Sequence, residues 1–220
     1  MTSDPVAASL HMQAQSRFAQ ARLAFAKGLA MLVLAGCGST PVVHFHTLAA
    51  DGRPPHREGA PAVLRGPAVV LEPVKVPVQV DQPQWLVRLP DGSMALLEQD
   101  RWSAPLRDEF QQALLEWLTQ RFGVVDARVV PSAGPLWRVR VDITRFESSP
   151  GEARMDGTWV ISTRAPESVV VRCSISSAER ADGGMEAVAQ AHRRAVAKLG
   201  DQIGEQLLAL QRGETPRCVG

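Results

Sequence analysis

The fold is decided by the stretch Trp137-Arg138-Val139-Arg140-Val141-Asp142-Ile143-Thr144, in which apolar and polar side chains alternate without a break. A period of two is the pattern of a β-strand with one face on a core and the other in water. The stretch ends near Phe146, and Ser149-Pro150-Gly151 then predicts a turn. We therefore expect a long strand that enters a hairpin.

Further strands are expected on both sides of this one. Downstream, residues 158–163 and 169–176 are apolar and β-prone, and Arg164-Ala165-Pro166-Glu167 separates them. Upstream, residues 85–89 and 94–97 flank Pro90-Asp91-Gly92-Ser93, a combination that predicts a hairpin.

The region before this hairpin is less regular. Four valines at every second position between Val74 and Val80 predict a half-buried strand, and Pro73 and Pro77 favour an edge position for it. Residues 42–48 form a short β-prone segment. Residues 49–67 are rich in Gly and Pro, which is typical of a loop.

In two other segments the apolar residues recur with the period of an α-helix. Apolar side chains recur at helical spacing from Leu106 to Leu118, and Arg121 continues the spacing, with Ser103 as a possible N-cap, Pro105 in the first turn and Gly123 where a helix should stop. A longer apolar stripe runs from Met185 to Leu210. The order strands, helix, strands, helix predicts an α+β single domain: a largely antiparallel β-sheet with two amphipathic helices packed on one face.

The N-terminal segment has the pattern of a bacterial lipoprotein signal. A short apolar run closes on Leu34, Ala35, Gly36 and Cys37, and a basic region without an acidic residue after Asp4 precedes it. Small residues before the cysteine let processing enzymes reach the backbone. We therefore expect residues 1–36 to be a signal peptide, with Met12 an equally sensible initiator, and the apolar run is too short to span a bilayer.

Cleavage before Cys37 would leave that residue as a lipidated N-terminus. Several acyl chains on one residue make a durable anchor, so a covalent lipid on Cys37 is the one non-protein group that we expect. Position 38 is Gly, whereas Asp there is the usual inner-membrane retention mark, and this favours the periplasmic face of the outer membrane. Residues 37–67 would hold the lipidated cysteine, a short strand and the loop, and residues 68–220 the folded domain. The alternative is a cytosolic protein in which Cys37 is only a small core residue.

Net charge and the two remaining cysteines indicate which kinds of binding and cross-linking to expect. The 24 basic and 23 acidic residues give a net charge of +1, and no basic cluster predicts nucleic-acid binding. An exported protein lies where disulfides form, and a bridge between Cys173 and Cys218 would tie the C-terminal tail to the sheet. The sequence cannot supply the Cα separation that a disulfide requires, so paired and free thiols both remain open. No His lies at ligand spacing from either cysteine.

The chain carries no motif of a hydrolase nucleophile, a phosphate-binding loop or a zinc peptidase. His44 and His46 share one face of a short strand and could contribute to a metal site, but strand histidines without a third ligand are usually structural. His192 lies on the apolar stripe of the last helix, which favours a packed or rim residue over a base. We therefore expect a protein that is not an enzyme, without a catalytic residue or a metal.

The ordered set of segments resembles one family, the ABC-type transport auxiliary lipoproteins, also called PqiC-like lipoproteins. That family has an aromatic-rich strand close behind the lipobox, a Val-rich strand rising to a turn, a helix that starts after a Trp, a Val-x-Val strand ending on Arg-Phe, a strand with Trp and a C-terminal helix. The matching segments here are, in order, His44-Phe45-His46-Thr47-Leu48, residues 74–80 with Asp81-Gln82-Pro83-Gln84, Arg101-Trp102-Ser103-Ala104-Pro105-Leu106, residues 139–146, Trp159 and the last helix. The two histidines, Gln82 and the tail with Cys218 depart from the family pattern.

The resemblance implies a family domain that starts near residue 42. It also implies a lipoprotein on the periplasmic face of the outer membrane, acting as a non-catalytic adaptor of an intermembrane lipid transport system. The implied partners are an MCE-domain protein and its inner-membrane permease, and a ring of identical subunits is one possible arrangement. The alternatives are a structural envelope lipoprotein that binds peptidoglycan or another outer-membrane protein and, third, a small periplasmic hydrolase. The sequence does not say which lipid moves or in which direction.

Overall fold

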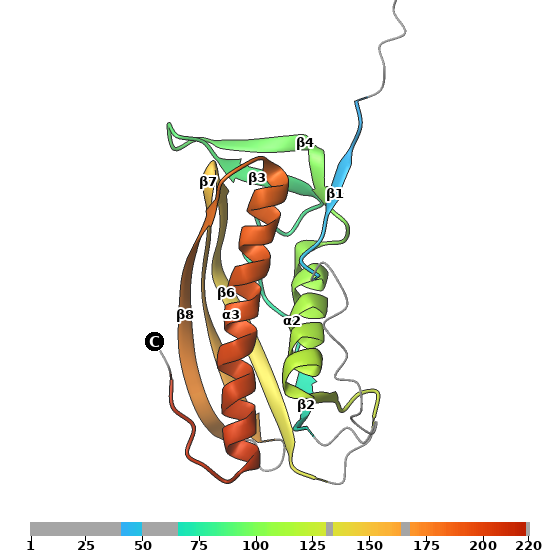
Figure 1. Cartoon of the computed structure of the whole chain (residues 1–220), viewed down its shortest axis with the longest axis vertical. Coiled ribbons are helices and arrows are strands. Elements are labelled where there is room, and N and C mark those ends of the chain that lie inside the picture. Colours follow the sequence, from blue (N-terminus) through green and yellow to red (C-terminus); the bar gives the residue numbers. More distant parts are fainter. Residues whose placement is uncertain (1–40, 50–65, 131–133, 164–167, 219–220) are drawn as a thin grey trace, which may run out of the picture. The chain divides into compact units, whose positions relative to one another are not determined.

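The computed structural model describes residues 41–49, 66–130, 134–163 and 168–218, and Val42 begins a compact unit that runs to the C-terminus. Within the described residues the unit consists of one eight-stranded sheet and two long helices (Figure 1). The strands are β1 (His44–His46), β2 (Ala68–Leu71), β3 (Gln84–Arg88), β4 (Met94–Trp102), β5 (Val125–Asp126), β6 (Leu136–Ser149), β7 (Gly151–Thr163) and β8 (Val169–Ala181). The helices are α2 (Leu106–Phe122) and α3 (Met185–Gln211).

The centre of the sheet is β6, the strand that the alternating stretch predicts. One edge of β6 pairs with β7, which pairs with β8. Its other edge pairs with β2 near its beginning, where Ala68 lies opposite Leu136, and with β3 near its end, where Val87 lies opposite Ser148. The order continues from β3 to β4 and β1, and from β2 to β5. A single long strand thus connects the two halves of the sheet.

The α+β class is confirmed, and the sheet is mixed. The hairpins β3–β4, β6–β7 and β7–β8 are antiparallel, as expected. The pairings of β1 with β4, of β2 with β5 and β6, and of β3 with β6 are parallel. These parallel pairs join strands that are distant in sequence, which a reading based on hairpin-length connections does not detect.

Both helices lie on the same face of the sheet and run side by side (Figure 1). Helix α3 packs on β7 and β8, and its apolar stripe is buried as predicted. The helices approach closely because α3 has glycines at the crossing: a Cβ on Gly200 would lie 2.3 Å from Trp117, and one on Gly204 would lie 2.3 Å from Phe122. The core between helices and sheet includes the buried rings of Trp85, Trp102, Trp159, Phe110 and Phe146.

The ends of α2 differ partly from the prediction. Gly123 ends the helix with a positive φ of 66°, as expected. The N-cap, however, is Pro105 rather than Ser103, and no side chain caps the helix there. The backbone N–H of Ser103 instead donates to the carbonyl of His46 at 2.9 Å. Ser103 therefore helps to hold β1 rather than the helix start.

The prediction of a strand between Val74 and Val80 is wrong. Only Lys75 forms a bridge, opposite Asp142, and the segment ends in a turn. Pro73 and Pro77 lack the N–H that a ladder needs, which explains why the pairing stops after one residue. The strand beside β6 is β2 instead.

Candidate functional site

The short strand β1 is surrounded by polar and charged side chains, of which His46 and Glu109 are buried and Glu186 is exposed. His46 is 6% exposed, with its Nε2 2.9 Å from Asp100 of β4 and its Nδ1 3.2 Å from Glu186 of α3. A carboxylate only accepts hydrogen bonds, so both contacts are satisfied when both ring nitrogens carry a proton. The imidazole then links β1 to the sheet and to α3.

The two residues that continue the chain beyond β1 are held by the helices. Glu109 of α2, itself buried, accepts hydrogen bonds from the Thr47 hydroxyl at 2.6 Å, the Leu48 amide at 2.9 Å and the Ser103 hydroxyl at 2.9 Å. Arg193 of α3 donates from Nε to the Thr47 carbonyl at 2.9 Å. We call the set His46, Thr47, Asp100, Glu109, Glu186 and Arg193 the clasp.

Charge complementarity within the clasp favours the ionised carboxylate of Glu186. Burial raises the pKa of Glu186, but a hydrogen bond from His46 and the charge of Arg193 outweigh it, so that its pKa is lower than usual. Arg193 Nη1 lies 3.1 Å from Glu186. The clasp therefore combines opposite charges with directed hydrogen bonds, an arrangement that holds a strand of three residues in place.

Behind the clasp lies a buried polar pair, Ser148 of β6 and His192 of α3. The indole N–H of Trp85 donates to Ser148 Oγ at 2.7 Å, and Ser148 Oγ lies 2.8 Å from His192 Nε2. The His192 ring is fully buried and stacks on Phe146 at 3.9 Å between centroids. Burial lowers the pKa of His192 to about 3, so the ring is neutral near pH 7. Because neither Ser148 nor His192 reaches the surface, this serine–histidine pair serves packing.

A groove runs between α2 and α3 next to the clasp. Its volume is about 270 Å³, and its lining is mostly apolar, with Leu48, Trp117 and Val196 among the lining residues. Arg193 and Arg194 also line it. A hollow of this size and character can receive a few apolar side chains of a partner.

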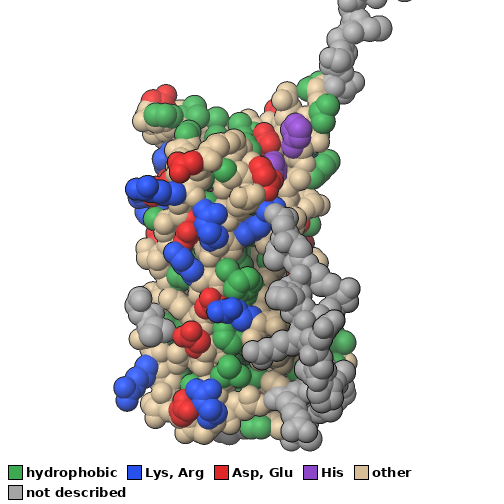
Figure 2. Space-filling model, viewed as in Figure 1, with side chains coloured by type: hydrophobic (Ala, Val, Ile, Leu, Met, Phe, Trp, Pro, Cys, Tyr) green, Lys and Arg blue, Asp and Glu red, His purple; other side chains and the backbone are tan. Residues whose placement is uncertain are grey.

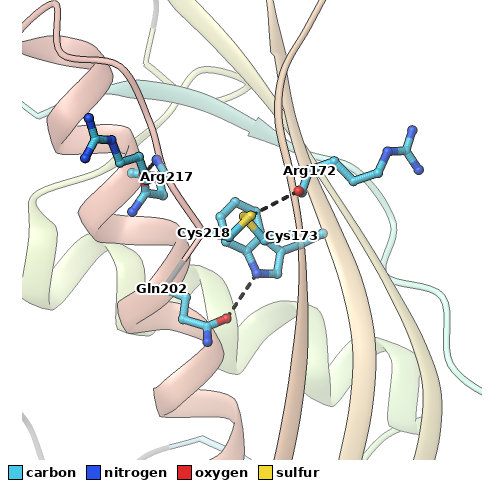
Figure 3. Close-up of a disulfide and its surroundings, with 7 residues drawn as sticks. Arg172, Cys173, Gln202, Arg217 and Cys218 are labelled. Atoms are coloured by element: carbon cyan, nitrogen blue, oxygen red, sulfur yellow. Dashed lines mark hydrogen bonds between the residues drawn. A yellow bond between two sulfur atoms is a disulfide. The ribbon is translucent and has the colours of Figure 1, made fainter. Parts of the chain in front are cut away.

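At the far edge of the sheet, Cys173 of β8 and Cys218 of the C-terminal tail are joined by a disulfide with a Cα separation of 5.5 Å (Figure 3). Beside it, the amide of Arg217 donates to Gln206 of α3 at 2.8 Å. The tail is thus attached to both α3 and β8.

The other sequence-predicted residues are placed as follows. Leu34, Ala35, Gly36 and Cys37 lie outside the described residues. His44 is exposed, whereas His46 belongs to the clasp. Over the described ranges, no group of three or more His, Cys, Asp or Glu side chains is arranged to hold a metal ion, and no helix is long and apolar enough to cross a membrane.

The sequence reasoning did not single out Glu109, Glu186 or Arg193. One signal was available for Glu109, because it follows Leu106 by three residues and so lies on the apolar stripe of α2. A carboxylate at such a position needs buried partners. The identity of those partners depends on β1, which is distant in sequence.

Comparisons with known proteins agree with this architecture. A family model described as "ABC-type transport auxiliary lipoprotein component" matches residues 46–204, which is most of the chain. Two crystal structures share the fold. One, of an uncharacterized protein, is 15% identical, covers 74% of this chain and 97% of its own, and has a TM-score of 0.59. The other, from Xanthomonas campestris, is 15% identical, covers 78% of this chain and 98% of its own, and has a TM-score of 0.57. No curated protein matches the sequence.

Proposed function

We propose that this chain, which belongs to the family of ABC-type transport auxiliary lipoproteins, is an outer-membrane-anchored adaptor of an MCE-type lipid transport system. The observation that carries the proposal is the combination of family membership with a lipobox that ends at Cys37. The compact unit begins at Val42, so only a short peptide separates the expected anchor from the fold.

The clasp has a mechanical role in this proposal. Any force between the membrane and the folded unit passes through β1, which pairs with β4 over three residues only. So short a parallel pairing is weak by itself, because few backbone hydrogen bonds hold it. His46, Glu109 and Arg193 add side-chain bonds from the sheet and from both helices. The anchor segment is thereby fixed to the whole core.

The groove between α2 and α3 is the surface that we assign to the transport partner. Its apolar lining suits the apolar side chains of an MCE-domain protein. The lipid-translocating and ATP-hydrolysing parts would then belong to the partner chains, and this chain would supply the fixed docking point at the outer membrane.

The test is affinity purification of the full-length, lipidated protein from gently solubilised envelopes, with mass spectrometry of the bait and of the proteins that accompany it. We expect an acylated Cys37 and an MCE-domain protein. The variant Ala197→Arg places a long charged side chain in the groove and should remove the partner, while Glu205→Arg, exposed on the same helix, should not.

Two results would contradict the proposal. Recovery of peptidoglycan-linked or porin partners alone would favour a structural envelope lipoprotein. Equal recovery of the MCE-domain protein with Ala197→Arg and with the parent would show that the groove is not its docking surface.

A further inference from the structure

The described part of the chain exposes large hydrophobic side chains mainly at one end of the molecule. Six of them belong to β1 and the β3–β4 hairpin or to the residues just beside them, namely Val42, Val43, Phe45, Leu89, Met94 and Leu96. The hairpin reaches across the upper end of the sheet in Figure 1, and Figure 2 shows hydrophobic side chains along the same edge.

Strand register places the hairpin residues on one face. Trp85 pairs with Leu97 and points into the core, so the next pair, Leu86 and Leu96, points the opposite way. Arg88 and Met94, two residues along each strand from that pair, lie on the same outer side as Leu96.

Strand β1 also contributes an outward-pointing apolar side chain. His46 pairs with Trp102, and both are buried, so Phe45 and its partner Arg101 point outward. The ring centroids of Trp85 and Trp102 lie 4.1 Å apart, which shows that the two inner faces are continuous. We call the exposed outward set Phe45, Met94 and Leu96 the end face; its Phe45 is 66% exposed.

The two arginines that share the outer side with the end face are paired with acids. Arg88 lies 2.8 Å from Glu147, and Arg101 lies 4.0 Å from Glu98. The end face therefore offers apolar area with little net charge. A surface of this kind binds by removing apolar area from water, with weak dependence on salt or on anionic groups.

The position of the end face along the chain indicates what covers it. Val42 follows Cys37 by five residues, and a peptide of that length spans at most about 17 Å. If Cys37 carries the acyl chains, Val42, which lies two residues before β1, cannot lie farther than this from the lipid surface. An exposed apolar face with little net charge that is kept so close to a bilayer can bury its side chains at the lipid interface.

We propose that the end face is a second, non-covalent membrane contact, in which Phe45, Met94 and Leu96 insert into the interface of the bilayer that holds the anchor. The proposal rests on the lipidation of Cys37. The contact would fix the tilt of the unit on the membrane, which an acyl anchor on a short peptide leaves free. The groove between α2 and α3 would then keep one orientation toward a partner.

The experiment uses the full-length acylated protein in vesicles of phosphatidylethanolamine and phosphatidylglycerol. A polarity-sensitive fluorophore is attached to Leu96→Cys and, as the matched control, to Val169→Cys. Val169 is also an exposed apolar residue, but it pairs with Ser162 at the opposite end of the sheet. Emission is measured with quenchers in the acyl region of the lipid and with iodide in the water.

We expect lipid-borne quenchers to remove roughly half or more of the Leu96 emission, because interfacial apolar faces lie about 5–10 Å deep. The Val169 probe should respond to iodide alone. Omitting phosphatidylglycerol should leave the Leu96 result unchanged.

Three outcomes would overturn the proposal and differ from one another. If the protein floats with the vesicles but the Leu96 probe behaves like the Val169 probe, the end face does not touch lipid and the anchor stands. If the Leu96 probe is shielded from iodide yet unaffected by lipid-borne quenchers, another protein surface covers it. If the protein does not float and its intact mass shows no acyl group on Cys37, the anchor proposal fails, and this inference fails with it.

Discussion

Replacing His192 by Gln should remove a large part of the acid sensitivity of folding. The folded-state pKa of His192 is about 3, against 6.5 in an unfolded chain, because burial opposes the charged imidazolium. Between these two pH values the unfolded chain binds a proton that the folded chain does not. The contribution to stability is therefore complete above pH 6.5 and decreases as the pH falls.

The magnitude follows from the two pKa values. At pH 5 the unfolded imidazole is almost fully protonated, and the linkage relation gives a loss of about 2 kcal/mol relative to pH 7.5. The loss continues to roughly pH 3 and then levels off. Gln cannot titrate, so a variant with Gln at this position should lack this component, although it will be less stable at neutral pH because the ring packs on Phe146.

The assay is urea unfolding followed by tryptophan fluorescence at several pH values between 5 and 7.5, on the parent, on His192→Gln and on His44→Gln. His44 is exposed and serves as the control. We expect the free energy of unfolding of the parent to fall by about 2 kcal/mol more than that of His192→Gln over this range. An equal fall in both proteins would refute the reasoning, since it would mean that the ring is hydrated or that the unfolded chain does not protonate it.

Three further substitutions test the clasp, the tail and the helix crossing by urea unfolding. Glu109→Ala leaves the buried Leu48 amide without its acceptor and should cost about 1–3 kcal/mol; a neutral effect would show that β1 does not depend on it. Cys218→Ser opens a disulfide that spans 45 residues and should cost up to about 4 kcal/mol under oxidising conditions, with no effect when the parent is reduced as well. Gly204→Ala places a Cβ 2.3 Å from Phe122 and should cost about 1–3 kcal/mol, whereas Glu205→Ala beside it should change stability by less than about 0.5 kcal/mol; equal effects of the two would contradict the close crossing.

The elements that the sequence predicted correctly are those whose pattern is local. The alternation from Trp137 to Thr144 corresponds to β6, the Ser149-Pro150-Gly151 turn starts β7, and the stripe from Met185 to Leu210 is α3. Gly123 ends α2 because the helix terminus requires the left-handed backbone conformation, which glycine adopts without steric cost. Each of these features depends on neighbouring residues, so one sequence is enough to read them.

Tertiary structure alone decided the parallel pairings and the clasp. Whether β1 lies beside β4, or β2 beside β6, depends on which distant segments meet, and four valines at alternate positions between Val74 and Val80 could not show that two prolines end the pairing. Glu109 is acceptable in the core only because Thr47 and Leu48 bring their donors to it. Local patterns thus determined which residues form helices and long strands. Which polar groups could be buried was determined by tertiary contacts, because a buried charge is stable only when its hydrogen-bond partners are in place.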